Sequence, residues 1–225
     1  MQRRLLVATL SLCMVAGASA APLKVVMLSG SVEYNSDESL PAYKAWLEEH
    51  YDAQATVLKA NGDSDLPGLE ALDDCDTALF FTRRLKITGE QLERVKRYLT
   101  GGKPIVGVRT ASHGFQNFLE FDKEVMGGNY QNHLPEGPTQ EAVVTPGGVG
   151  HPILEGVGRL KSRYSVYRTG PLAPDTQELL HIKTMDGKEP VFWMRGTDKN
   201  GKSIREDADH PVAWTREYKG GRVFY

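Results

Sequence analysis

The chain has too little cysteine to be held together by disulfides. It contains two cysteines in 225 residues, Cys13 and Cys75. Cys13 lies in an N-terminal segment that we expect to be removed, which leaves Cys75 without an intramolecular partner. The rest of the sequence also lacks a CxxC pair and a histidine–cysteine cluster with zinc-finger spacing. We therefore expect Cys75 to be a packed thiol and stability to come from the core.

A hydrophobic run long enough to span a membrane is also missing. Residues 1–20 have two arginines, a short apolar stretch and a small-residue end, which is typical of a signal peptide cleaved before Ala21. A transmembrane helix needs ~20 apolar residues. A lipid anchor on Cys13 is less favoured, because bulky Leu12 precedes it. We expect a secreted or periplasmic protein with no membrane partner after cleavage.

The chain carries no strong charge of either sign. Its formal charge is −2, and loss of the two arginines in the leader makes it −4. Such mild acidity gives no reason to expect a nucleic-acid partner. Residues 21–225 suit a single domain with a sizeable core, and no linker divides them.

The first half of the chain alternates between apolar runs and amphipathic segments. The runs at 23–30, 54–60, 77–82 and 104–108 predict strands buried on both faces, as in parallel sheets. The segments between them predict helices on both faces of that sheet. We expect one helix capped by Ser39 with Pro41 in its first turn, one with a capping box of Thr88 and Gln91, and one from His113 to about Phe121.

The second half is β-rich, with a hairpin turn expected at 219–221 and a solvated loop at 195–210. Strands are predicted at 141–145, 165–169, 178–184, 190–194, 211–218 and 221–225. In a doubly wound α/β sheet of this kind, ligands bind outside the carboxyl ends of the parallel strands. Candidate site residues are therefore sought directly after the strands of the first half.

The exit of the fourth strand has the richest chemistry. Arg109, Thr110, Ser112 and His113 follow the small residues of a sharp turn. His113 is a candidate for proton transfer, and the other three are candidates for substrate binding. In the alternative interpretation, Ser112 caps a helix and His113 is a solvated residue of its first turn.

Two neighbouring strand exits add charged groups. Arg83 and Arg84 follow the third strand and could bind a carboxylate, a phosphate or sugar hydroxyls. Glu33 and Tyr34 follow the first strand, with Glu33 as a second catalytic candidate and Tyr34 as a binding residue. The alternative is that Glu33 forms an ion pair with one of the arginines.

The segment that joins the two halves offers Asn129 and His133 as further binding residues. A metal site made of His113, His133 and either His151 or His210 is an alternative, because imidazole is a common ligand. No i, i+4 histidine pair supports it, so we predict neither a metal nor another cofactor.

Several stretches together resemble the ThuA-like (trehalose-utilisation) family of the class I glutamine amidotransferase-like superfamily. They include SGSVEYNSDESL, LPGLEALDDCDTALFFTRRL, GKPIVGVRTASHGFQNF, GGNYQNH, HPIL and HPVAWTREYKGGRVFY. The resemblance implies a flavodoxin-like, doubly wound, mostly parallel sheet with a β-rich C-terminal half. It also implies that Arg109 stands where amidotransferases carry a nucleophilic cysteine. A guanidinium cannot form a thioester, so glutamine hydrolysis by that route is not expected.

The same resemblance suggests a function in carbohydrate metabolism. Members are associated with trehalose and related glucosides and are often described as secreted glycosyl hydrolases. We expect a small carbohydrate as partner, bound or processed at the carboxyl edge of the sheet. The alternative is a non-catalytic sugar-binding or interaction module. Similar members continue past the last strand into a Gly-His segment and a helix, so we expect this chain to be truncated after Tyr225.

Overall fold

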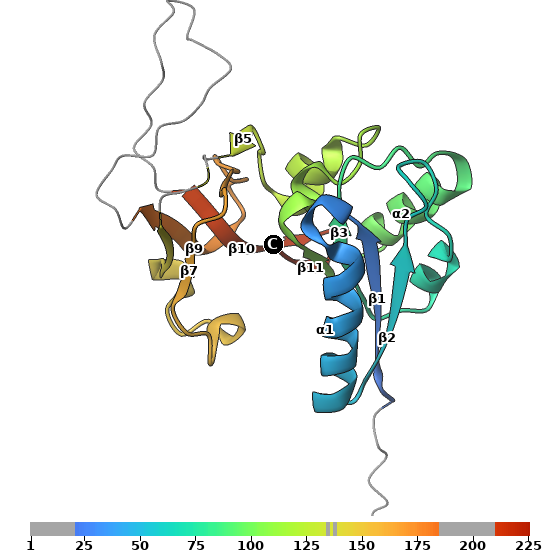
Figure 1. Cartoon of the computed structure of the whole chain (residues 1–225), viewed down its shortest axis with the longest axis horizontal. Coiled ribbons are helices and arrows are strands. Elements are labelled where there is room, and N and C mark those ends of the chain that lie inside the picture. Colours follow the sequence, from blue (N-terminus) through green and yellow to red (C-terminus); the bar gives the residue numbers. More distant parts are fainter. Residues whose placement is uncertain (1–20, 134–135, 137–138, 185–209) are drawn as a thin grey trace, which may run out of the picture.

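The protein forms one large sheet with helices on both faces (Figure 1). The computed structural model describes residues 21–133, 136, 139–184 and 210–225. Its α-helices are α1 (Ser36–His50) and α2 (Gly89–Thr100). Its strands are β1 (Leu23–Gly30), β2 (Ala53–Lys59), β3 (Thr77–Thr82), β4 (Ile105–Gly107), β5 (Asn132–His133), β6 (Gln140–Val144), β7 (Leu160–Ser162), β8 (Tyr167–Arg168), β9 (Gln177–Thr184), β10 (His210–Tyr218) and β11 (Gly221–Phe224).

The nine-stranded sheet has the order β2-β1-β3-β4-β11-β10-β9-β6-β7. Neighbours from β2 to β11 are parallel, and those from β11 to β7 are antiparallel. A separate pair is formed by β5 and β8. This is the doubly wound, flavodoxin-like α/β fold that the sequence predicts, with its β-rich C-terminal half.

The register of the parallel strands builds two cores. Val26 pairs with Ala78, which pairs with Ile105, and all three belong to the larger core, which also includes the apolar face of α2. Met27 and Leu79 form the next row and pack on the opposite face with Leu40 of α1. Because successive side chains of a strand alternate between faces, both faces of β1 are buried, as the apolar run predicts.

The start of α1 differs from the prediction. The helix begins at Ser36 rather than after Ser39, so Pro41 lies inside it and not in its first turn. The Ser36 hydroxyl accepts a hydrogen bond from the Ser31 backbone N–H at 2.8 Å and shares another with the Ser29 hydroxyl at 2.9 Å. These contacts with the β1 exit set the beginning of the helix, and sequence periodicity does not report them.

The predicted capping box of α2 is only half correct. Thr88 is the residue before the first turn, but its side chain makes no capping hydrogen bond. Gln91 instead accepts from the Leu66 backbone N–H at 3.0 Å and donates to Asp65 at 2.8 Å. The glutamine therefore ties α2 to the preceding loop.

The helix predicted from His113 to Phe121 is wrong. The chain instead forms a short 3-10 turn at Arg109–His113 and a π-helical turn at Phe121–Met126. Between them, Leu85 forms an isolated parallel bridge with Phe115. This bridge competes with helical hydrogen bonding by extending the pairing of the third and fourth strand exits.

The last two strands meet in the predicted hairpin. Lys219 and Gly220 have φ values of 52° and 88°, the two positive values that a type I′ turn requires. Two other expected features, residues 1–20 and the strand at 190–194, lie outside the described residues, as does the expected loop apart from His210. Within the described ranges, no helix has the length and apolar character needed to cross a membrane.

Candidate functional site

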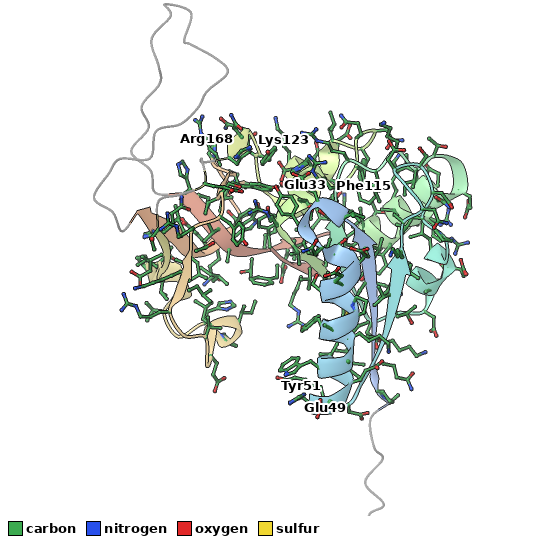
Figure 2. The ribbon with its side chains drawn as sticks, in the orientation of Figure 1. Glu33, Glu49, Tyr51, Phe115, Lys123 and Arg168 are labelled. Carbon is green, nitrogen blue, oxygen red and sulfur yellow. The ribbon has the colours of Figure 1, made fainter. Side chains whose placement is uncertain are left out.

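The carboxyl ends of β1, β3 and β4 lie side by side, because these strands are neighbours in the sheet. They deliver Glu33 with Tyr34, Arg83 with Arg84, and the Arg109–His113 turn to one edge. Figure 2 shows Glu33 and Phe115 at this edge, above the strands. The sequence prediction that these exits meet at a common edge is confirmed.

The turn after β4 is sharp and left-handed at its first residue. Arg109 has a φ of 44°, a conformation that residues other than glycine seldom adopt. A Cβ on Gly107, two residues earlier, would lie 2.2 Å from the terminal methyl of Met126, so a larger residue there would displace that side chain. The turn therefore places an arginine at a strained, left-handed position directly after a strand, where a nucleophile elbow has its nucleophile.

The Arg109 guanidinium is enclosed by two aromatic rings. Its carbon lies 4.4 Å from the ring centroid of Tyr34 and 4.3 Å from that of Tyr167. Its two terminal nitrogens donate to the carbonyl and hydroxyl oxygens of Ser165, at 2.8 and 3.0 Å. The Tyr225 hydroxyl donates to the Arg109 carbonyl. These contacts give Arg109 a strong internal role, joining the β4 turn to the β-rich half.

Thr110 and Ser112 are buried within the turn. The Thr110 hydroxyl donates to the Ser31 hydroxyl at 2.9 Å, which connects the β4 and β1 exits. The Ser112 hydroxyl bonds to the Arg109 carbonyl at 3.2 Å and to Nδ1 of His113 at 3.1 Å. Because both hydroxyls are buried and bonded within the protein, Thr110 and Ser112 are better placed to hold the turn and the imidazole in position than to contact a ligand.

His113 lies in an aromatic and cationic environment. Its ring stacks on Tyr130 with centroids 4.5 Å apart, and Tyr167 lies 5.5 Å away. Burial is the largest cause that lowers the pKa of His113 to about 4, followed by the positive charges of Arg84, Arg83, Arg109 and His133. His113 is therefore neutral near pH 7 and able to accept a proton.

Glu33 is held by an arginine. Its carboxylate forms a 2.8 Å ion pair with Arg83, and both side chains remain partly exposed. This matches the alternative interpretation of Glu33 as an ion-pair partner. A proton-transfer role for Glu33 would have to operate from within this pair.

Arg84 is fixed beside His113 by its backbone. Its N–H donates to the His113 carbonyl at 2.8 Å, and the Leu85 N–H donates to the Gly114 carbonyl at 2.9 Å. Its φ of 51° is also left-handed. The Arg84 side chain is exposed and forms no ion pair with any residue in the described part of the chain.

The joining segment reaches the same region through β5. Asn129 is half-buried, and its backbone N–H donates to the Thr169 carbonyl at 2.7 Å. His133 is exposed and pairs across the strands with Tyr167. His133 therefore lies on the strand next to Tyr167, whereas Asn129 lies at the start of the segment that leads to it.

Four residues outside the predicted set shape this site. Tyr130 stacks on His113, Tyr167 packs at a tilt beside it, Ser165 binds Arg109, and buried Asp122 accepts from the Tyr130 N–H at 2.6 Å. Tyr130 lies within the family-like stretch GGNYQNH, and Ser165 and Tyr167 lie within the strand predicted at 165–169. Neither pattern indicates that these side chains contact the turn after β4.

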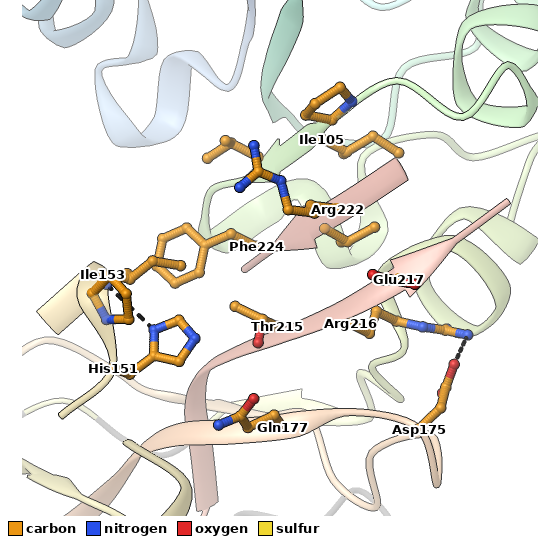
Figure 3. Close-up of a pocket in the computed structure, with 14 residues that line it drawn as sticks. Ile105, His151, Ile153, Asp175, Gln177, Thr215, Arg216, Glu217, Arg222 and Phe224 are labelled. Atoms are coloured by element: carbon orange, nitrogen blue, oxygen red, sulfur yellow. Dashed lines mark hydrogen bonds and ion pairs between the residues drawn. The ribbon is translucent and has the colours of Figure 1, made fainter. Parts of the chain in front are cut away.

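A separate cavity of about 570 Å³ lies on the face of the sheet that α1 partly covers (Figure 3). His151, Phe224 and Arg222 are among its lining residues, and none of the expected site residues lines it. His151, an optional member of the alternative metal set, thus lines a cavity that neither His113 nor His133 lines. In the described ranges, no group of three histidine, cysteine, aspartate or glutamate residues could hold a metal ion. Cys75 is buried, as predicted, and burial raises the pKa of its thiol.

Comparison with known proteins identifies the family. The sequence profile described as "ThuA: Trehalose utilisation" matches residues 24–225. The chain belongs to the ThuA family. This membership connects it with trehalose utilisation. No curated protein has a significantly similar sequence.

Solved structures agree with this ThuA assignment at the level of the fold. A ThuA-like protein from Bacteroides uniformis superposes with a TM-score of 0.63 at 15% identity, covering 93% of this chain and 84% of that one. A ThuA-like protein from Parabacteroides merdae gives a TM-score of 0.59 at 13% identity, covering 90% and 78%. A glutamine amidotransferase from Thermotoga maritima gives 0.44 at 10% identity, covering 90% and 75%.

Proposed function

We propose that this ThuA-family protein binds and processes a small carbohydrate, of the trehalose or glucoside class, at the edge formed by the β1, β3 and β4 exits. The observation that carries the proposal is the convergence of His113, Arg84 and the Arg83–Glu33 pair beside a wall of tyrosines. Arginine and tyrosine side chains supply the hydrogen bonds that fix a sugar in a site.

His113 is the proton-transfer group in this proposal. A pKa of about 4 keeps the imidazole neutral at pH 7, so Nε2 can accept a hydrogen bond from a substrate hydroxyl; efficient proton abstraction then requires the bound substrate to raise this pKa towards 7. The Ser112 hydroxyl, 3.1 Å from Nδ1, orients the ring and leaves Nε2 for the substrate.

Ordinary two-carboxylate glycoside hydrolysis is not the chemistry that we propose. That reaction needs two carboxyl groups on either side of the scissile bond. Among the described residues of the edge, Glu33 is engaged by Arg83, and Asp122 is buried beneath Tyr130. This favours the second candidate, a binding module without turnover, over a conventional hydrolase.

Amide hydrolysis is excluded from the proposal on chemical grounds. Arg109 is taken to stand where an amidotransferase has its cysteine, and its guanidinium is enclosed by Tyr34 and Tyr167. It cannot act as a nucleophile. Cys75 is buried beside the Leu72 carbonyl and lies before β3, away from the carboxyl edge. The purified protein should therefore release no ammonia from glutamine.

Calorimetric titration and turnover assays with trehalose, 3-keto-glucosides and glucose test the proposal. A His113→Ala variant should lose turnover while keeping its fold. His151→Ala, which removes an imidazole from the separate cavity, is the matched control and should leave turnover unchanged. Binding without turnover, unaffected by His113→Ala, would instead support the non-catalytic module.

Export belongs to the same proposal. The basic start, apolar run and small-residue end of residues 1–20 favour removal of this segment during secretion to the periplasm or the exterior. N-terminal sequencing of the protein from the exported fraction should give Ala21 as the first residue. Recovery of the uncleaved chain from the cytoplasm would contradict export.

A further inference from the structure

The side chains that act electrostatically on His113 are all basic. The electrostatic influences on His113 come from Arg84, Arg83, Arg109 and His133, and all four oppose its protonation. The same three arginines act on the hydroxyl of neighbouring Tyr130. A functional histidine is often oriented by a carboxylate, but here Nδ1 faces the Ser112 hydroxyl.

The carboxylates near this edge do not balance the positive charge. Glu33 neutralises Arg83 through its 2.8 Å ion pair. Asp122 lies behind Tyr130, and burial raises its pKa to about 6, which weakens it as a counter-charge. Arg109 is occupied by Ser165 and two aromatic rings, so, among the edge residues that the structure describes, Arg84 offers an exposed guanidinium without an ion-pair partner.

The structure also holds Arg84 in a costly backbone conformation. Its φ of 51° is unfavourable for a residue with a side chain, and its N–H bond to the His113 carbonyl keeps it there. Strained positions of this kind cluster at ligand-binding sites, although tight turns such as the one at Lys219 also use them. An exposed, strained arginine with no described ion-pair partner is better suited to a ligand than to the fold.

We infer that the carbohydrate bound at this edge carries an anionic group, a carboxylate or a phosphate, which pairs with Arg84 next to His113. This inference rests on the proposed function and adds the class of substrate to it. The planar guanidinium can form two parallel hydrogen bonds to either group. Burial raises the pKa of Tyr130, so its hydroxyl stays protonated near the sugar.

Calorimetric titration of the purified protein with four probes tests the inference: glucuronate, glucose 6-phosphate, glucose and inorganic phosphate. One or both of the anionic sugars should bind at least about tenfold more tightly than glucose, as expected for a charge-assisted pair. Comparing the affinities of glucuronate and glucose 6-phosphate shows whether the site prefers a carboxylate or a phosphate. Inorganic phosphate controls for binding of the anion alone.

A pair of charge-matched variants localises the effect. Arg84→Gln should weaken binding of the preferred anionic sugar at least about tenfold, because it removes the charge and most of the donors. Arg222→Gln removes the same charge from an exposed position of β11 and should leave the affinity unchanged. Circular dichroism checks that both variants fold.

The titration of His113 provides an independent readout. An anion placed beside Arg84 should raise the pKa of His113 by at least about one unit, which NMR of the imidazole measures with and without the preferred sugar. A neutral sugar at the same place should leave that pKa nearly unchanged.

The results that would overturn the inference are distinct from those that would overturn the proposed function. If glucose binds as tightly as the anionic sugars and Arg84→Gln has no effect, the substrate is neutral and the carbohydrate site stands. If inorganic phosphate binds as tightly as the sugar acids, Arg84 recognises an anion without a sugar. If no probe moves the His113 resonance, both the inference and the proposed site fail.

Discussion

The imidazole of His113 lies against the ring of Tyr130, with centroids 4.5 Å apart and an angle of 26° between the planes. This contact brings together the turn after β4 and the segment between the π-helical turn and β5, which is not part of the large sheet. It also buries the imidazole among cationic neighbours. The protonation state of His113 is therefore a property of the assembled site, and it can be measured.

We predict that His113 titrates near pH 4. In an NMR titration, its imidazole should remain neutral through pH 5.5 or so, whereas an unperturbed histidine titrates at about 6.5. Tyr130→Ala should raise the pKa of His113, since burial is the largest cause of its depression. A midpoint near 6.5 in the native protein would contradict the described packing.

The depressed pKa of His113 has a consequence for stability. Between pH 6.5 and 4, the unfolded chain binds a proton at His113 that the folded protein does not. The free energy of unfolding should therefore fall as the pH drops through this window. Urea unfolding at pH 7 and pH 5 should show a smaller loss for His113→Gln than for the native protein, and an equal loss would argue against the prediction.

Asp122 should affect the pH dependence of the free energy of unfolding in the opposite direction to His113. Burial raises its pKa to about 6, so the folded protein holds this proton between pH 3.8 and 6 while the unfolded chain releases it. Its contribution to the free energy of unfolding should fall as the pH rises through that window, by on the order of 3 kcal/mol. Asp122→Asn should abolish this contribution in urea unfolding followed from pH 4 to 7. No change in the pH profile of the variant would refute an elevated Asp122 pKa.

Arg84→Gly should stabilise the protein while weakening ligand binding. Glycine adopts the φ of 51° at little cost, so we expect the free energy of unfolding to rise by about 0.5–1 kcal/mol. Arg222→Gly, in the regular strand β11, is the control and should lower it by a similar amount. Thermal unfolding of the two variants measures both effects. A loss of stability in Arg84→Gly would mean that the arginine serves the fold.

Arg109→Ala should destabilise the fold strongly, and it does not relieve the positive φ, because alanine also carries a Cβ. It removes two hydrogen bonds to Ser165 and the contacts with two aromatic rings. We expect a loss of about 2–4 kcal/mol in urea unfolding. Arg83→Ala, which breaks a partly exposed ion pair, should cost less than about 1 kcal/mol. Similar losses in the two variants would contradict the internal role of Arg109.

Sequence patterns predicted the parallel half of the fold well for a physical reason. The runs at 23–30 and 77–82 have central residues, 25–28 and 78–81, that are all apolar, because both faces of β1 and β3 are buried. The turn at Lys219 and Gly220 could also be predicted from the sequence, because glycine favours the positive φ that this turn requires. Local sequence was sufficient where local burial or local geometry determined the structure.

The assembled site was predictable only in part. That the strand exits of Arg83 and His113 meet follows from the parallel topology. The contacts of Arg109 with Ser165 and the two tyrosines do not follow from that topology, because Ser165 lies 56 residues away in the chain. The strand predicted at 165–169 is present as β8, but the sequence does not indicate that it pairs with β5 instead of joining the large sheet. The helix expected after His113 failed for a related reason, since the bridge from Leu85 to Phe115 replaces helical hydrogen bonds.

A crystal structure of the protein with glucuronate or glucose 6-phosphate tests the central claim most directly. We predict that the sugar lies at the carboxyl edge, with its anionic group on Arg84 and a hydroxyl within hydrogen-bond distance of His113. A sugar bound instead in the 570 Å³ cavity beside His151 and Phe224, with the edge around His113 empty, would contradict it.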